Sequence, residues 1–160
     1  MSDFSRPAVE RRHPPDVLMK AVNPLTRRLV SGGRAGDQLL ELHFIGRKTG
    51  RRYDVPAGYR LLDGVPTVLT NSRWRHNFRG GRDIEVTLRG QRRPAHASLV
   101  DDPSAVAAVY HRLLEEMGWR SAQRRLGIRI NVDRAPSVAE LEEMVRRCGL
   151  SLVPVRLRDG

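Results

Sequence analysis

The sequence predicts an α+β fold, a small antiparallel β-barrel of about six strands with peripheral helices. Apolar residues alternate with polar ones in several short runs between residues 38 and 99, which is the period of β-strands. Two junctions between runs, Asp63-Gly64 and Arg89-Gly90, are typical of tight hairpins. After these strands, helical patterns with capping residues appear beyond residue 100. A chain of 160 residues that is 39% hydrophobic can bury one such core.

The first predicted strand begins near Gln38, where Leu40, Leu42 and Phe44 alternate with polar residues. We expect further strands at residues 54–62, 65–70, 84–88 and 95–99, and a closing strand at residues 150–157. Pro56 and Pro66 fall inside two of these runs. Since proline donates no ladder hydrogen bond, we expect both at sheet edges or bulges.

Two helices are predicted in the second half of the chain. Asp102-Pro103 supplies an N-cap and a first-turn proline, and the helical pattern continues to Gly118. Ser137 and Glu140 form a capping box for a helix that ends at Gly149. Residues 1–34 are predicted to form an N-terminal arm and an amphipathic helix. That helix is compatible with packing on its own domain, with a membrane surface and with a partner.

Composition excludes several classes of protein. No apolar run approaches the roughly 20 residues that span a bilayer, and the N-terminus has no signal-peptide core, so we expect a cytoplasmic protein, with peripheral membrane contact as an alternative. Dinucleotide-binding, P-loop and hydrolase-elbow motifs are missing. The histidines lack metal-ligand spacing, so no metal is predicted. The single Cys148 cannot form an intramolecular disulfide and is given no catalytic role.

A cationic turn is the most informative motif in the chain. The turn reads Gly-Arg-Lys-Thr-Gly over residues 46–50, between two predicted strands. Its glycines permit a tight bend that brings backbone N–H groups close to an anion. Arg47 offers a planar fork, Lys48 a compact charge and Thr49 a hydroxyl, which together suit a phosphate or a carboxylate. An aromatic and amide cluster, Trp74 to Phe78, follows the next two strands.

The order and spacing of these motifs resemble the deazaflavin-dependent nitroreductase and quinone-reductase family, whose members bind coenzyme F420 in a split β-barrel. The resemblance covers roughly Leu39 to Leu99 and includes the turn, Pro56, the Asp63-Gly64 hairpin and the Trp74 cluster. It implies that residues 35–160 form a split β-barrel that binds a deazaflavin. It also implies hydride transfer from reduced F420 to a quinone-, enone- or nitro-type acceptor.

The family's binding residues can be carried over by position. The turn residues would line the phosphate and the tail of the cofactor, and the backbone after the turn would border the deazaflavin ring. The end of the next long strand, with the tryptophan and asparagine that follow it, would complete the pocket. The implied residues are Arg47, Lys48, Thr49, Val55, Pro56, Ala57, Thr70, Asn71, Ser72, Arg73, Trp74 and Asn77. No catalytic residue is assigned, because a deazaflavin carries the hydride on its own ring.

Two other functions stay open at this stage. The same barrel would also suit FMN, FAD or another flat ligand. The net charge of +11 is compatible with a basic nucleic-acid-binding protein, although only 5% of the residues are aromatic and no nucleic-acid motif is present. The expected partner is a small-molecule acceptor. The exposed strand edges of a barrel are compatible with a homodimer, and both monomer and dimer stay open.

Overall fold

The computed structural model describes residues 7–11 and 39–158, and they belong to two compact units. One unit contains strand β1 (Val9–Arg11) and residues Asp101–Ser151. The other contains residues 39–100 and 152–158. The predicted N-terminal helix and the predicted boundary at residue 34 lie outside the described residues.

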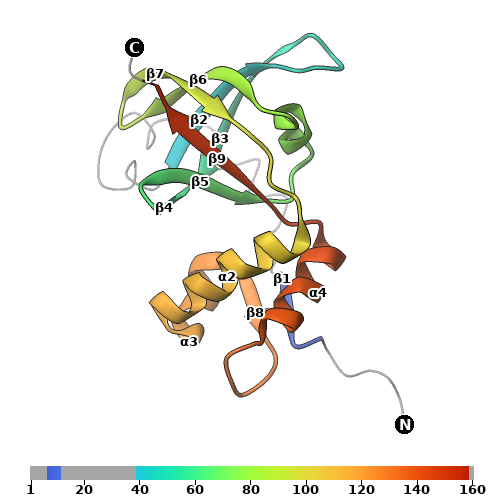
Figure 1. Ribbon diagram of the computed structural model, residues 1–160. Coiled ribbons are helices and arrows are strands. Elements are labelled where there is room, and N and C mark those ends of the chain that lie inside the picture. The colour runs from blue at the N-terminus through green and yellow to red at the C-terminus, as the bar shows by residue number, and fades with distance from the viewer. Residues whose placement is uncertain (1–6, 12–38, 159–160) are drawn as a thin grey trace, which may run out of the picture. The chain divides into compact units, whose positions relative to one another are not determined.

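The barrel unit is built on one seven-stranded sheet in the order β3-β2-β6-β7-β9-β5-β4 (Figure 1). The β2–β3, β2–β6, β6–β7, β7–β9 and β4–β5 pairings are antiparallel, as the sequence predicts. The strands are β2 (Leu39–Ile45), β3 (Arg52–Gly58), β4 (Arg60–Leu62), β5 (Val65–Thr70), β6 (Arg82–Leu88), β7 (Gln91–Ala97) and β9 (Ser151–Leu157).

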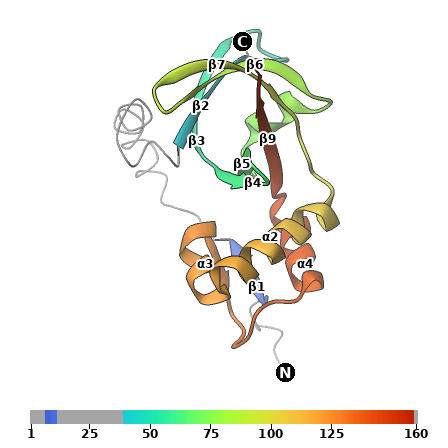
Figure 2. The ribbon, with the colours of Figure 1, turned by 60° about the vertical axis from the view of Figure 1, so that its left-hand side comes forward.

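The run predicted as one strand over residues 54–62 is divided at Tyr59. Its first half is β3, which pairs with β2, and its second half is β4, which pairs with β5. These two halves are the opposite ends of the sheet order, yet a single residue separates them in the chain. The sheet therefore curls until its ends meet, and β3 contacts β5 (Figure 2). The result is an α+β split-barrel arrangement, which confirms the predicted fold class.

The core of the barrel follows the predicted alternation. Leu40, Leu42 and Phe44 of β2 face inward and are buried, while Glu41 and His43 face outward. Similar inward positions on the other strands complete the core: Val68, Ile84, Val86, Ala95, Ala97, Val153 and Val155.

Both predicted hairpins are confirmed by their backbone geometry. Asp63 and Gly64 have φ values of 51° and 80°, and Arg89 and Gly90 have φ values of 52° and 76°. Two successive positive φ angles are characteristic of the type I′ turn, whose twist matches that of the flanking strands. Pro56 lies on the edge strand β3, as expected. Pro66 lies on β5, which has β9 and β4 on its two sides in the sheet order and is therefore not an edge strand.

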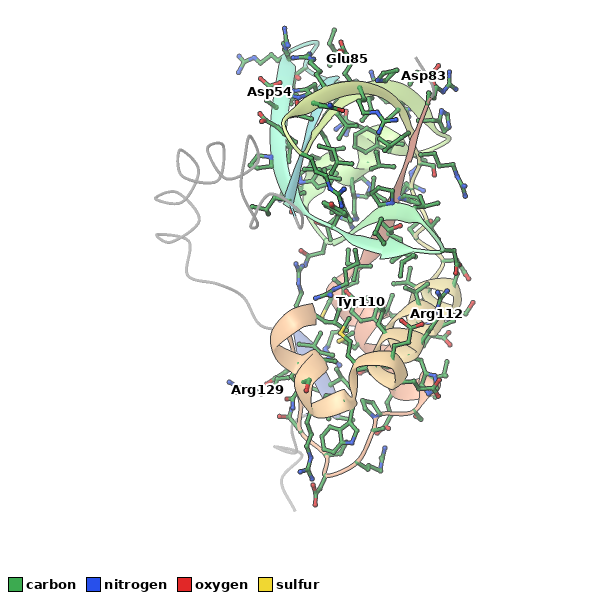
Figure 3. The ribbon with its side chains drawn as sticks, turned by 90° about the vertical axis from the view of Figure 1, so that its left-hand side faces the viewer. Asp54, Asp83, Glu85, Tyr110, Arg112 and Arg129 are labelled. Atoms are coloured by element: carbon green, nitrogen blue, oxygen red, sulfur yellow. The ribbon has the colours of Figure 1, made fainter. Side chains whose placement is uncertain are left out.

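The helical unit contains α2 (Pro103–Met117), α3 (Trp119–Leu126), β8 (Ile128–Ile130) and α4 (Val138–Cys148). Asp102 caps α2 by accepting a hydrogen bond from the Ala105 backbone at 3.1 Å, as predicted. Tyr110 of α2 is buried within this unit (Figure 3). Helix α3 and the β1–β8 pair were not predicted. Each strand of that pair has three residues and its partner is far away in sequence, so no local pattern indicates it.

The predicted capping box of α4 is present, and Glu140 within it is expected to make the stability of the helical unit depend on pH. Arg134 bonds the Glu140 carboxylate, the Ser137 backbone also donates to it, and these contacts lower its pKa to about 2. Because the folded pKa lies below the usual value of 4.5, this stabilisation is present above about pH 4.5 and is lost as the pH falls towards 2. We expect the thermal midpoint of Glu140→Gln to change less than that of wild type over this window. An equal change of thermal midpoint with pH in the two proteins would contradict the role assigned to Glu140.

Within residues 7–11 and 39–158, no helix combines the length and the apolarity that crossing a bilayer requires.

Candidate functional site

The cationic turn joins β2 to β3 and is held by backbone hydrogen bonds. The Gly46 N–H donates to the Arg51 carbonyl at 2.8 Å, and the Gly50 N–H donates to the Gly46 carbonyl at 2.9 Å. Gly50 has a φ of 66°, which favours glycine. A Cβ on Gly46 would lie 2.6 Å from both the Thr49 hydroxyl and the Tyr53 ring, so only glycine fits there without a shift of these side chains. The side chains of Arg47, Lys48 and Thr49 are exposed.

Asn77 connects the turn to the predicted aromatic cluster. Residues Arg73–Phe78 form a short 3-10 helix, η2, which the sequence did not predict. The Asn77 Oδ1 accepts from the Arg47 backbone N–H at 2.9 Å, and its Nδ2 donates to the Trp74 carbonyl at 2.9 Å. The two halves of the predicted motif, 30 residues apart in the sequence, are therefore joined by one side chain.

A set of four aromatic rings lies beneath this junction. Phe44 stacks on Tyr53 with ring centroids 5.6 Å apart, and it meets Phe78 edge to face at 5.0 Å. Trp74 meets Phe78 edge to face at 5.9 Å. Phe78 is fully buried, whereas Trp74 and Tyr53 are partly exposed. This continuous set, which we call the aromatic wall (Phe44, Tyr53, Trp74 and Phe78), fixes the position of η2.

The remaining predicted residues lie on β3 and at the end of β5. Val55, Pro56 and Ala57 are half-buried on β3, and Val55 and Ala57 pack on the same core as Trp74. Thr70 ends β5 and is buried, with its hydroxyl accepting from the Ser72 backbone at 3.0 Å. Asn71 and Ser72 are half-buried, Arg73 is exposed, and Ser72 makes no side-chain cap to η2. Contact between β3 and β5 brings the strands that carry these two groups together.

The positive charge of the chain is concentrated in the barrel unit. Its described residues carry fourteen arginines and lysines against five carboxylates, whereas the described helical unit has nine of each. Some of these arginines hold the backbone of the site. Arg82 donates to the Ile45 carbonyl at 2.9 Å, and Arg75 donates to the carbonyls of Asn71 and Ser72 at 2.6 and 2.9 Å. The resulting surface favours anions.

Cavities lined by described residues of the barrel unit include one on the outer face of the sheet and one near a hairpin. One, of about 470 Å³, lies on the outer face of β2 and β6, where its lining includes His43, Arg52 and Asp83. A hydrogen bond from His96, with the nearby charge of Arg158, holds the pKa of Asp83 below its usual range. The other, of about 320 Å³, lies near the Arg89-Gly90 hairpin. None of the twelve predicted cofactor-binding residues lines either cavity.

Sequence reasoning missed three residues that shape the site. Tyr53 and Phe44 face each other across the β2–β3 hairpin, and the register set by the turn could have indicated this pair. Arg82 anchors the start of the turn from β6, which pairs with β2. Its role depends on which strands are neighbours, and no local signal reveals that order.

No protein-family model matches the chain, and no curated protein matches it. Among solved structures, the chain is similar to the crystal structure of HutZ, a heme storage protein from Vibrio cholerae. The sequence identity is 14% and the TM-score is 0.44, over 87% of this chain and 92% of that chain.

Proposed function

We propose that this protein is an F420-dependent oxidoreductase that transfers a hydride from reduced deazaflavin to a quinone-, enone- or nitro-type acceptor. The observation that supports this proposal most strongly is the Asn77 bridge between the cationic turn and η2. The bridge joins the two segments on which the family resemblance depends, because Asn77 bonds both the cationic turn and the backbone of Trp74.

The chemistry of the donor groups fits the tail of the cofactor. Arg47 and Lys48 are exposed cations on a turn whose backbone is fixed, and Thr49 adds a hydroxyl. Charge-assisted hydrogen bonds from such groups to phosphate are about twice as strong as neutral ones. Arg73 on η2 offers a further exposed cation. These residues would hold the phosphate and the carboxylates of the tail.

The ring of the cofactor would lie against β3 and η2. The partly buried Val55 and Ala57 offer apolar contact, and Trp74 offers an aromatic face or edge. The Ser72 hydroxyl, which does not cap η2, is suited to donate to an oxygen of the ring or of the acceptor. When bound, a deazaflavin supplies the hydride itself, so the protein's part is to bind, orient and shield.

A binding titration tests this proposal. Purified protein is titrated with oxidised F420, FMN, haem and a short DNA duplex at low and moderate salt. We expect F420 binding to depend less on salt than DNA binding does, because apolar contact between the ring and the aromatic wall adds to the charge contacts of the tail. Tighter binding of FMN or haem than of F420 would show that the protein binds another flat ligand, and would overturn the F420 assignment. DNA binding that weakens steeply with salt would indicate a nucleic-acid-binding protein.

Lys48→Ala is expected to weaken F420 binding by about ten- to a hundredfold, the effect of losing one hydrogen bond to a charged group. Arg93→Ala is the matched control, because Arg93 belongs to the same basic unit but lines the 320 Å³ cavity. Its F420 affinity should equal that of wild type. Equal losses in both variants would show that net charge alone attracts the ligand, and an unchanged affinity in Lys48→Ala would overturn the assignment of the turn.

Activity is measured separately from binding. Oxidation of reduced F420 is followed by absorbance with a small quinone, an enone and a nitroaromatic compound as acceptors. Binding without oxidation by any of them would retain the cofactor assignment and remove the reductase assignment.

A further inference from the structure

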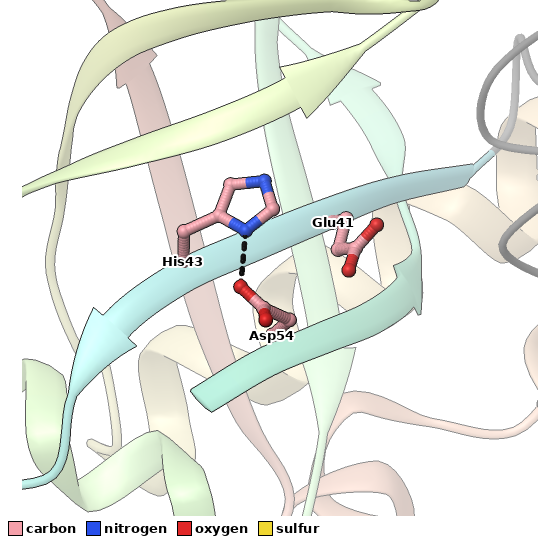
Figure 4. A group of neighbouring side chains, drawn as sticks. All are labelled: Glu41, His43 and Asp54. Atoms are coloured by element: carbon pink, nitrogen blue, oxygen red, sulfur yellow. Dashed lines mark hydrogen bonds and ion pairs between the residues drawn. The ribbon is translucent and has the colours of Figure 1, made fainter. Parts of the chain in front are cut away.

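Three side chains with metal-binding chemistry gather on the outer face of the β2–β3 hairpin: Glu41, His43 and Asp54 (Figure 4). Glu41 and His43 are two residues apart on β2 and therefore share a face. Asp54 lies directly opposite His43 in the β2–β3 register. One ligand atom from each residue lies within 4.8 Å of the others. Two paired strands thus present a nitrogen and two carboxylates from a rigid scaffold.

His43 is held at both ring nitrogens. Its side chain is only 8% exposed, with Nδ1 2.6 Å from Asp54 Oδ1 and Nε2 2.7 Å from Thr87 Oγ1. A hydroxyl can either donate or accept, so Thr87 on β6 suits either tautomer of the ring. A cation at Nδ1 would leave Nε2–H to donate to Thr87. A histidine ligand whose second nitrogen donates to a fixed partner is the usual arrangement in metal sites.

The group gathers acidic side chains within a basic unit. The described barrel unit has five carboxylates and fourteen basic side chains. Two of the five carboxylates are Glu41 and Asp54. Two carboxylates that share a site repel each other unless a positive group lies between them. Arg52 lies beside this pair, with its Nε 3.9 Å from Asp54 Oδ1, and its side chain is 64% exposed.

We propose that Glu41, His43 and Asp54 form a binding site for a divalent transition-metal ion. One imidazole with two carboxylates and no thiolate suits Zn²⁺ or Mn²⁺, and Zn²⁺ is the ion to test first. Ligand atoms about 2.1 Å from a tetrahedral ion are about 3.4 Å apart, so side-chain shifts of about an ångström are enough. Three protein ligands leave one position for water or another ligand. This site lies on the outer face of the sheet and does not depend on the proposed deazaflavin function.

The test uses the full chain without an affinity tag, treated with a chelator and then titrated with Zn²⁺ by calorimetry. We expect one ion per chain. His43→Ala and Glu41→Gln should each weaken binding at least tenfold, and Thr87→Val by about ten- to a hundredfold, the usual effect of removing a partner of a metal ligand. Co²⁺ gives a second measurement, because its visible absorption spectrum reports the nitrogen and oxygen ligands directly.

His96→Ala is the matched control. His96 also pairs with an aspartate, since its Nδ1 lies 2.9 Å from Asp83 Oδ1 on the neighbouring β6–β7 pair, but it belongs to no group of three ligands among the described residues. Zn²⁺ affinity should be unchanged in this variant. Circular dichroism and the thermal midpoint of each metal-free variant establish that it is folded. Absence of stoichiometric binding to wild type, or wild-type affinity in a folded Glu41→Gln variant, would overturn the proposal.

Discussion

Phe78→Ala is expected to lower the free energy of unfolding of the barrel unit by about 3–5 kcal/mol, the usual cost of removing a buried phenyl ring. Phe78 is fully buried, and its ring meets both Phe44 and Trp74 edge to face. The substitution therefore removes the centre of the aromatic wall and the only buried side chain of η2. Urea unfolding followed by tryptophan fluorescence measures this change.

The two tryptophans of the chain allow the measurement to be assigned to one unit. Trp74 belongs to the barrel unit and Trp119 to the helical unit, so a Trp119→Phe background leaves only the barrel reporter. Phe78→Leu is the matched control, with an expected loss below about 1.5 kcal/mol because most of the volume is kept. A loss below about 1 kcal/mol for Phe78→Ala would mean that the ring is not packed as described.

Asn77→Ala is expected to release the cationic turn from η2 and to cost about 2 kcal/mol of stability. The side chain accepts from the Arg47 N–H and donates to the Trp74 carbonyl, and each hydrogen bond contributes about 1 kcal/mol net. Hydrogen exchange at the Arg47 amide measures the release directly. This amide should be protected in wild type and should exchange markedly faster in the variant.

The Asn77→Asp variant distinguishes the contributions of the two hydrogen bonds of Asn77. The carboxylate keeps an acceptor for the Arg47 N–H but loses the donor to the Trp74 carbonyl. We expect the Arg47 amide to stay protected in Asn77→Asp, while stability falls by about half as much as in Asn77→Ala. Wild-type exchange at Arg47 in Asn77→Ala would show that the bridge does not hold the turn. If the proposed function holds, Asn77→Ala should also weaken F420 binding, because a released turn pays an ordering cost on binding.

The sequence by itself determined the elements whose signals are local. Alternation at Leu40, Leu42 and Phe44 predicted β2 and its buried face, and the Asp63-Gly64 dipeptide predicted a hairpin, which its positive φ angles confirm. The caps at Asp102 and Ser137 predicted where α2 and α4 begin. These signals are reliable because strand periodicity, turn geometry and helix capping each depend on residues within a few positions of one another.

Only the tertiary structure decided how these elements combine. The run over residues 54–62 looks like one strand, because alternation does not show which neighbour each half will choose. Its division at Tyr59 places β3 and β4 at the two ends of the sheet and makes the sheet curl. The order of strands depends on burying one shared core, which is a property of the whole unit.

The same distinction applies to the candidate sites. The sequence indicated the cationic turn and the Trp74 cluster separately, and the structure showed that Asn77 joins them. Local spacing in the sequence carried no metal signal for His43. Its neighbours Asp54 and Thr87 come from adjacent strands, at separations of 11 and 44 residues. Contacts between strands depend on register and strand order rather than on local spacing, and so they became visible only once the chain was folded.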